Sequence, residues 1–407
     1  MGIPVTYQAI LIASIFLLLA FGVERLGRTA GIPSAILLIA TGLAGKPVLA
    51  SFGLALEGIG AAVPIVGTLG LILIVLEGAL DIKLRRDRLR AASSGFLMAF
   101  GGLVSCAALF TLVAYLALDL TLHQSAVLAV PFAVISSTIA IPSSGFLPPW
   151  GREFVIYESS FSDILGVLVF FSLLNSDGTL GGALMGLIGG GVLSLFLAVI
   201  CAVGLVLILM RIDGHIRFTP LLAGLFGLYA AGKLMHLSPL ILVLLFGLML
   251  NNPGLIVRLR PFRGWLDEQY ETTLEEFKLL ILELTFAVRG FFFILLGYWT
   301  DLMELVSLES WLSALLVLAV VYGSRYVMLR VSRFDLLVPL TCIAPRGLIT
   351  VLLFLAAKEA VSLPHFLYGT VMLVVLVSAT MITVGRYRLA AADAATASSR
   401  GQPSEST

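Results

Sequence analysis

Thirteen apolar stretches of about membrane length dominate this chain of 407 residues. Charge clusters and Pro/Gly turns separate them, at about 7–24, 33–49, 61–80, 94–117, 124–148, 153–175, 180–210, 218–235, 238–252, 277–299, 309–329, 337–357 and 364–385. A transmembrane helix needs about 20 consecutive apolar residues. Because 59% of the residues are hydrophobic and only 12% are charged, the chain is predicted to be an all-α polytopic membrane protein rather than a soluble domain with an anchor.

The distribution of basic residues tests the number of spans. If the first span begins outside, 19 of the 25 Lys and Arg residues fall in inside loops, and only Lys46, Lys233 and Lys358 fall outside. An error in the number of spans would invert every later loop, so the asymmetry predicts thirteen spans with the N-terminus outside and the C-terminus in the cytoplasm. Residues 1–389 then form the transmembrane domain, and the Ala/Ser/Thr-rich residues 390–407 form a disordered cytoplasmic tail.

The sequence offers no sign of enzymatic chemistry. Its three cysteines lie far apart in apolar spans, and its four histidines show no metal-ligand spacing. No HExxH, CxxC, GxSxG or Walker motif is present, and no basic patch points to nucleic acid. We therefore expect no enzyme activity, no cofactor and no nucleic-acid partner, and membrane lipid as the surroundings of the chain.

Two carboxylates lie within the sixth span, where charge is costly and therefore rare. On a helix, Ser159, Ser162 and Asp163 share one face, so that their oxygens could form one polar pocket. Asp163 lies about 7.5 Å deeper along the helix axis than Glu158. A carboxylate beside hydroxyl groups in mid-membrane can bind a small hard cation or a proton. For Glu158, simple neutralisation by an arginine of another span is the competing interpretation.

Two spans carry signs of interruption. Pro131 and Pro142 bracket the β-branched, hydroxyl-rich segment 134–141 in the fifth span, and residues 343–347 place Pro, Arg and Gly inside the twelfth. The two spans are seven apart, an odd offset, so equivalent helices would cross the membrane in opposite directions. This pattern is typical of an inverted repeat whose two discontinuous helices cross at mid-membrane, where secondary transporters bind substrate. The long seventh stretch is expected to be one tilted helix linking the repeats.

These motifs resemble those of the monovalent cation:proton antiporter superfamily, nearest to its sodium/proton exchanger branch. The string ESSFSDILGV of the sixth span is similar to the branch's E-S-x-x-N-D-G-V pattern, with Ser162 where Asn is usual. LEGALDI around Glu77, FFFILLGYWTDL in the tenth span and APRGLIT in the twelfth resemble further motifs of the branch. The fifth span departs from the usual T-D-P, because Thr138 is followed by Ile139, and its SSTIAI string looks more like the potassium-efflux branch.

The resemblance implies a role for each matching residue. Asp163 would carry the cation or the proton, and Ser159, Ser162 and the backbone near Thr138 would complete the site. Glu158 would form a structural ion pair with Arg325, and Arg346 would offset the helix-end dipoles where the twelfth span unwinds. Arg289 would match a basic position on the tenth span, and Glu77 the third-span motif. The resemblance also implies a homodimer in the plasma (inner) membrane.

The sequence therefore predicts a secondary active antiporter that exchanges Na⁺, K⁺ or Li⁺ for H⁺ by alternating access. One carrier carboxylate without an adjacent second Asp predicts a one-for-one, electroneutral exchange, which should slow at low pH as protons outcompete the metal ion. The alternative is a sodium-coupled symporter of a small organic anion, with Arg346 as a carboxylate ligand. A channel, or a sensor that only binds an ion, is a further alternative.

Overall fold

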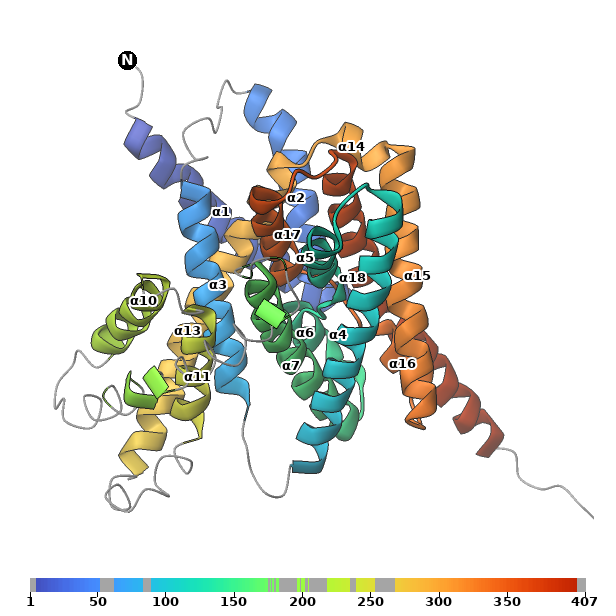
Figure 1. Ribbon diagram of the computed structural model, residues 1–407. Helices are drawn as coiled ribbons and strands as arrows, with labels where there is room; N and C mark the ends of the chain where they lie inside the picture. The colour runs from blue at the N-terminus through green and yellow to red at the C-terminus, as the bar shows by residue number, and fades with distance from the viewer. Residues whose placement is uncertain are drawn as a thin grey trace, which may run out of the picture.

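The computed structural model describes residues 5–51, 62–82, 89–174, 176, 178, 181–182, 196–197, 199–201, 204, 218–234, 239–252 and 268–400. Within these ranges all regular structure is helical (Figure 1). The helices are α1 (Val5–Ala30), α2 (Ser34–Ser51), α3 (Ala62–Asp81), α4 (Leu89–Ala117), α5 (Leu122–Ala133), α6 (Ser137–Ser143), the 3₁₀ turn η2 (Ser144–Phe146), α7 (Pro149–Leu174), α10 (Phe218–Leu234), α11 (Pro239–Asn251), α13 (Glu268–Trp299), α14 (Leu302–Val306), α15 (Leu308–Val331), α16 (Leu337–Cys342), α17 (Leu348–Ala360) and α18 (Phe366–Arg400).

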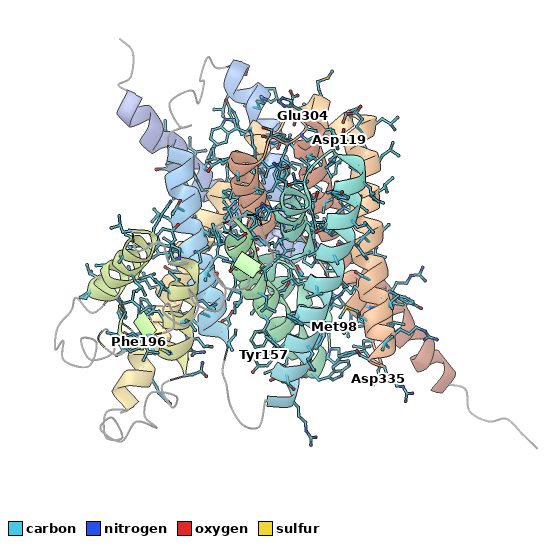
Figure 2. The ribbon with its side chains drawn as sticks, in the orientation of Figure 1. Met98, Asp119, Tyr157, Phe196, Glu304 and Asp335 are labelled. Carbon is cyan, nitrogen blue, oxygen red and sulfur yellow. The ribbon has the colours of Figure 1, made fainter. Side chains whose placement is uncertain are left out.

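The helices confirm the predicted all-α polytopic architecture. Six of the described helical segments are long and apolar enough to cross a membrane, and shorter apolar helices accompany them. Every predicted stretch coincides with a helix or a pair of helices except the seventh, at 180–210, which lies largely outside the described residues. Charged side chains mark both ends of the bundle, with Asp119 and Glu304 at the upper end and Asp335 at the lower end in Figure 2.

Both predicted interruptions are present. The fifth span is divided into α5 and α6 by Val134–Ser136, and the twelfth into α16 and α17 by Ile343–Gly347. Val134 and Ser136 have extended backbones, with ψ of 132° and 116°, a conformation that suits the β-branched Val134 and its neighbour Ile135. In the twelfth span, Pro345 has no N–H to offer a helix. The two breaks meet, since the N–H of Ser136 donates to the carbonyl of Pro345 at 2.9 Å.

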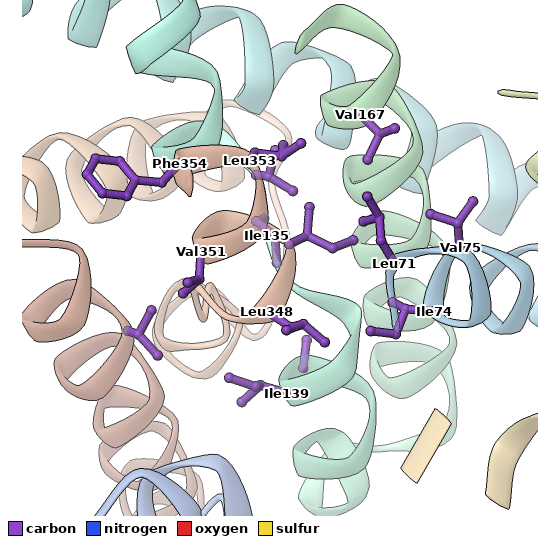
Figure 3. Packing of buried hydrophobic residues seen from close by; sticks show 14 of the residues in the cluster. Leu71, Ile74, Val75, Ile135, Ile139, Val167, Leu348, Val351, Leu353 and Phe354 are labelled. Atoms are coloured by element: carbon purple, nitrogen blue, oxygen red, sulfur yellow. The ribbon is translucent and has the colours of Figure 1, made fainter. Parts of the chain in front are cut away.

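Apolar side chains pack around this crossing (Figure 3). Leu71 and Ile74 of α3 lie toward Leu348 of α17 and the segment around Ile135 and Ile139, with Val75 and Val351 farther out on either side. These side chains belong to one large buried cluster. Apolar side chains therefore cover one side of the polar breaks, where an unpaired backbone group would be costly.

Gly347 permits the close approach of the two breaks. A Cβ at this position would lie 2.5 Å from Ser136 Oγ and 2.9 Å from Ser136 Cβ. We expect Gly347→Ala to lower stability by about 1–3 kcal/mol, as overpacking of a core does, and Ser136→Gly to restore most of the loss in the double variant. Thermal unfolding of the three variants checks this. A double variant that is no more stable than Gly347→Ala would contradict it, because the clash would then not be with Ser136.

The last helix is longer than the sequence indicates. α18 continues to Arg400, so the expected boundary at residue 389 falls within a helix, and residues 390–400 of the predicted disordered tail are helical. The sequence over these residues is rich in alanine, the strongest helix former, which explains the extension. Residues 401–407 lie outside the described residues.

Candidate functional site

Asp163 lies where α7 passes the break between α5 and α6. The side chain is 7% exposed, and its Oδ2 accepts a hydrogen bond from the backbone N–H of Ser137 at 3.1 Å. Its Oδ1 has no hydrogen-bond partner among the described residues. A buried carboxylate oxygen without a partner is costly, so this oxygen is free to take a proton or a metal ion.

Ser159 and Thr138, the other hydroxyl-bearing residues predicted for this site, lie on the two helices that meet at Asp163. Ser159 lies one helical turn before Asp163 on α7, and its hydroxyl donates to the carbonyl of Val155 at 2.7 Å, which leaves its oxygen lone pairs to accept. Thr138 lies on α6, next to Ser137, and its hydroxyl is 2.8 Å from that of Ser136. Neutral oxygens of this kind suit hard cations such as alkali-metal ions.

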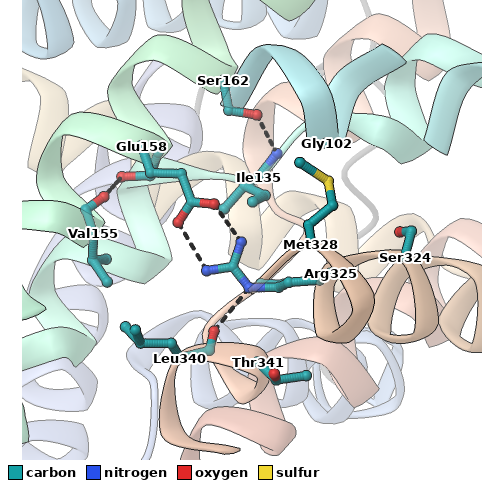
Figure 4. Close-up of polar contacts among 12 residues, drawn as sticks. Gly102, Ile135, Val155, Glu158, Ser162, Ser324, Arg325, Met328, Leu340 and Thr341 are labelled. Atoms are coloured by element: carbon teal, nitrogen blue, oxygen red, sulfur yellow. Dashed lines mark hydrogen bonds and ion pairs between the residues drawn. The ribbon is translucent and has the colours of Figure 1, made fainter. Parts of the chain in front are cut away.

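Ser162 has a different position from the other two. Its Oγ accepts a hydrogen bond from the backbone N–H of Ile135 at 2.9 Å (Figure 4). Ile135 is in the non-helical break, where its N–H has no carbonyl of a preceding turn to bond. The Ser162 hydroxyl therefore provides the hydrogen-bond acceptor for a backbone N–H of the break. The structure uses it for this backbone contact rather than for a contact with Oδ1 of Asp163.

Glu158 and Arg325 form a two-pronged ion pair between α7 and α15 (Figure 4). Arg325 Nη1 is 2.5 Å from Glu158 Oε1, and Nη2 is 2.8 Å from Oε2. Arg325 Nε also donates to the carbonyl of Leu340 in α16 at 2.8 Å. The side chains of Glu158 and Arg325 are 2% and 6% exposed. Each charge is thus compensated in the apolar interior, as a buried charge requires.

Arg346 lies in the break of the twelfth span and points to the end of α5. Its Nε donates to the carbonyl of Phe132 at 2.6 Å, and its Nη2 to that of Ala133 at 3.4 Å. These two residues end α5, where helix carbonyls have no intrahelical partner and carry partial negative charge. The side chain is 1% exposed, so the helix end and the guanidinium stabilise each other away from water.

A cavity of about 670 Å³ leads toward this region between α1, α3, α6, α7 and α13. Glu77 of α3, Ser137 and Thr138 of α6 and Arg289 of α13 line it. Arg289 is close enough to attract Glu77 electrostatically. The cavity therefore extends from Glu77 and Arg289 to Ser137, whose backbone N–H donates to Asp163.

Sequence reasoning missed two contributors to the site. Ser137 supplies the N–H that holds Asp163, and Arg152 lines the same cavity as Glu77 and Arg289. The SST string at the predicted interruption was the available signal for Ser137, because the first N–H groups of a helix that follows a break need partners. For Arg152, at the edge of a span, a solvated position was the ordinary expectation.

Comparison with known proteins gives a consistent result. Residues 10–386 match the family described as sodium/hydrogen exchanger, transmembrane. Two structures of the sodium proton antiporter MjNhaP1 from Methanocaldococcus jannaschii have the same fold. One has a TM-score of 0.71 at 19% identity and covers 92% of this chain and 96% of its own. The other, from electron microscopy, has a TM-score of 0.69 at 18% identity and covers 100% of both chains.

A search of curated proteins finds no match. At identities of 18–19% the two solved structures establish the fold, and the match of the sequence over nearly its whole length establishes the family. This chain belongs to the sodium/hydrogen exchanger family.

Proposed function

We propose that this protein is a secondary active antiporter that exchanges a monovalent cation for H⁺ across the plasma membrane. Na⁺ is the proposed cation, and K⁺ and Li⁺ are the alternatives. The observation that carries the proposal is the open Oδ1 of Asp163, a buried carboxylate oxygen beside the crossing of two interrupted helices. Membership of the family supports cation:proton antiport as the coarser function.

In this proposal Asp163 is the shared binding group for both substrates. A proton and a metal ion compete for one carboxylate, so occupancy by either excludes the other. Ser159 and Thr138 supply neutral oxygens to the bound cation, with Glu77 at the cavity side. Ser162, whose oxygen accepts from Ile135, holds the break in shape instead of binding the ion.

Competition between a proton and a cation for Asp163 produces exchange under two conditions. The site must open alternately to the two sides of the membrane, and it must not change sides without a bound ion. A charged side chain at the centre of a bilayer costs at least about 2.5–3.5 kcal/mol, so an unloaded, ionised Asp163 resists the transition. Either a proton or a monovalent cation removes the net charge, which gives a one-for-one, electroneutral cycle. Glu158 takes no part in this cycle, because Arg325 donates to both of its oxygens.

The proposed setting follows from the sequence and the family. The N-terminus lies outside and the C-terminus in the cytoplasm, as the basic residues of the loops predict. In this orientation the cavity beside Glu77 opens to the cytoplasm, because α3 ends and α7 begins at that side. We also propose a homodimer.

Purified protein in liposomes tests the proposal. The liposomes carry a trapped pH dye and an acidic interior, and Na⁺, K⁺, Li⁺ or an organic cation is added outside in turn. We expect the dye signal to recover with Na⁺, through proton efflux coupled to cation entry, and not with the organic cation.

Three outcomes contradict the proposal. Absence of recovery with all three alkali-metal ions would rule out exchange as assigned. Recovery of the dye, or uptake of Na⁺, that requires an added organic anion would instead indicate the sodium-coupled symporter. Ion flux without proton counterflow would indicate a channel.

A further inference from the structure

A second cavity, of about 530 Å³, adjoins the first at the end of the bundle where α1 ends and α7 begins. Arg152 of α7, Arg289 of α13 and Arg386 of α18 all line it. Glu24 of α1 is the only acidic residue in its described lining. The cavity therefore gathers three positive charges from three helices against one negative charge.

The three arginines are not paired with carboxylates. No hydrogen bond or salt bridge of their guanidinium groups is found within the part of the chain that the structure describes, whereas the buried Arg325 and Arg346 each donate through all three guanidinium nitrogens. Arg289 has only the longer-range attraction of Glu77. Three guanidinium groups around one polar space repel one another, and an anion between them removes that repulsion.

The position of Arg386 depends on the end of α1. Gly31 ends this helix with a positive φ of 69°, and the N–H of Ile32 closes the turn on the carbonyl of Gly27 at 3.0 Å, which is the usual glycine C-cap arrangement. The guanidinium of Arg386 packs directly on Gly31, so any side chain there would collide with it. The glycine at this turn thus leaves room for Arg386 beside the cavity.

We propose that this cavity binds a phosphate-bearing anion, supplied by a lipid headgroup or by free phosphate, and that the bound anion slows exchange. Guanidinium groups bind phosphate oxygens with two parallel hydrogen bonds each. The hydroxyls of Ser143 and Thr383, which also line the cavity, can donate to the remaining oxygens. A cavity of this size accommodates a small organic phosphate.

The expected slowing of exchange follows from the helices on which the three arginines lie. Arg152 on α7 and Arg386 on α18 belong to helices that pack around the two interrupted spans, while Arg289 is on α13, which packs on α1, α2 and α3. Alternating access moves one bundle of helices against another, so an anion that bridges these two groups stabilises the arrangement with the cavity and depopulates its alternative. This consequence rests on the proposed antiport, whereas anion binding itself does not.

Thermal unfolding of the full-length protein in detergent tests the binding. Inorganic phosphate is compared with chloride at equal ionic strength. We expect saturating phosphate to raise the unfolding temperature of the wild type by about 2 °C or more, and to have no such effect on Arg386→Gln. Arg388→Gln is the matched control, because Arg388 is also exposed on α18 but does not line the cavity. Arg152→Gln replaces Arg386→Gln if the latter does not fold.

Exchange in liposomes distinguishes the two sources of phosphate. If a headgroup binds, exchange by the wild type and by Arg388→Gln is about threefold slower with phosphatidylglycerol than in pure phosphatidylcholine, and Arg386→Gln is insensitive. If free phosphate binds, added phosphate slows exchange in both lipids, again only when Arg386 is present.

Two results would overturn the proposal. One is stabilisation by phosphate that equals that by chloride, with no lipid effect that depends on Arg386. The other is an equal response of the Arg386→Gln and Arg388→Gln variants, which would indicate general surface charge. Asp163→Asn separates this proposal from the function above, because its phosphate response should persist even where no exchange can be measured.

Discussion

Asp163→Asn is expected to reduce cation-dependent proton movement to the rate of protein-free liposomes. Asparagine has nearly the shape of aspartate, and its carbonyl oxygen can still accept the hydrogen bond from Ser137 N–H. It cannot be protonated at any accessible pH, however, and has no charge to hold a cation. The variant should therefore fold normally, with the thermal stability of the wild type or higher, and lose both substrates together.

The matched control for this variant is Asp335→Asn. Asp335 is exposed in the turn before α16, at the end of the bundle, so the same chemical change there should leave exchange unchanged. Recovery of the pH dye by Asp163→Asn at the wild-type rate would show that another group carries the proton. The unfolding temperature of Asp163→Asn shows whether a loss of exchange is due to the missing carboxylate or to loss of folded protein.

Removal of one partner of the Glu158–Arg325 pair should have the largest effect on stability. We expect Arg325→Ala to lower the free energy of unfolding by about 3–5 kcal/mol, because it leaves the buried Glu158 carboxyl group without its partner and removes the hydrogen bond from Arg325 Nε to the carbonyl of Leu340. Glu158→Gln/Arg325→Met should recover much of the loss, since no unpaired charge remains. Unfolding in denaturant or on heating measures both.

An exposed ion pair provides the comparison. Lys278 and Glu275 are 3.0 Å apart on α13, with the Glu275 side chain 62% exposed, and Glu275→Gln should cost less than about 1 kcal/mol. If the double variant of the buried pair were as unstable as Arg325→Ala, compensation of charge would not be the reason for the pair. Its directional bonds to α7 and α16 would then be the main contribution.

The sequence predicts the fold of this protein well because, in a bilayer, hydropathy along the chain is enough to locate the helices. A run of apolar residues in a bilayer has one regular structure open to it, and Pro, Arg and Gly together at 345–347 favour an interruption, although Pro47 and Pro131 lie within helices. The boundaries of the helices were less predictable. The extension of α18 beyond residue 389 depends on the helix propensity of alanine, which hydropathy does not measure.

The sequence predicts the acidic residues of the site, but it does not predict the hydrogen-bond partners of the hydroxyl groups around them. An acid inside an apolar span is conspicuous wherever it falls, so Asp163 and Glu158 stand out in the sequence. Whether a hydroxyl faces an ion or a backbone N–H depends on a segment about 27 residues away, as with Ser162 and Ile135. Helical spacing places Ser159 and Ser162 on one face with Asp163, but it cannot say which of them the break uses.

The contacts between the two interrupted segments constrain how the protein can move. Ser136 N–H bonds to the carbonyl of Pro345, and Arg346 to that of Phe132, so each break supplies the partners that the other lacks. Separation of the two would uncover polar groups in a medium without water, at a cost of several kcal/mol for each group. In the proposed antiport cycle the crossing is therefore expected to move as one unit. Apolar contacts, such as those between α3 and α17 (Figure 3), are the kind that can slide without the exposure of a backbone polar group.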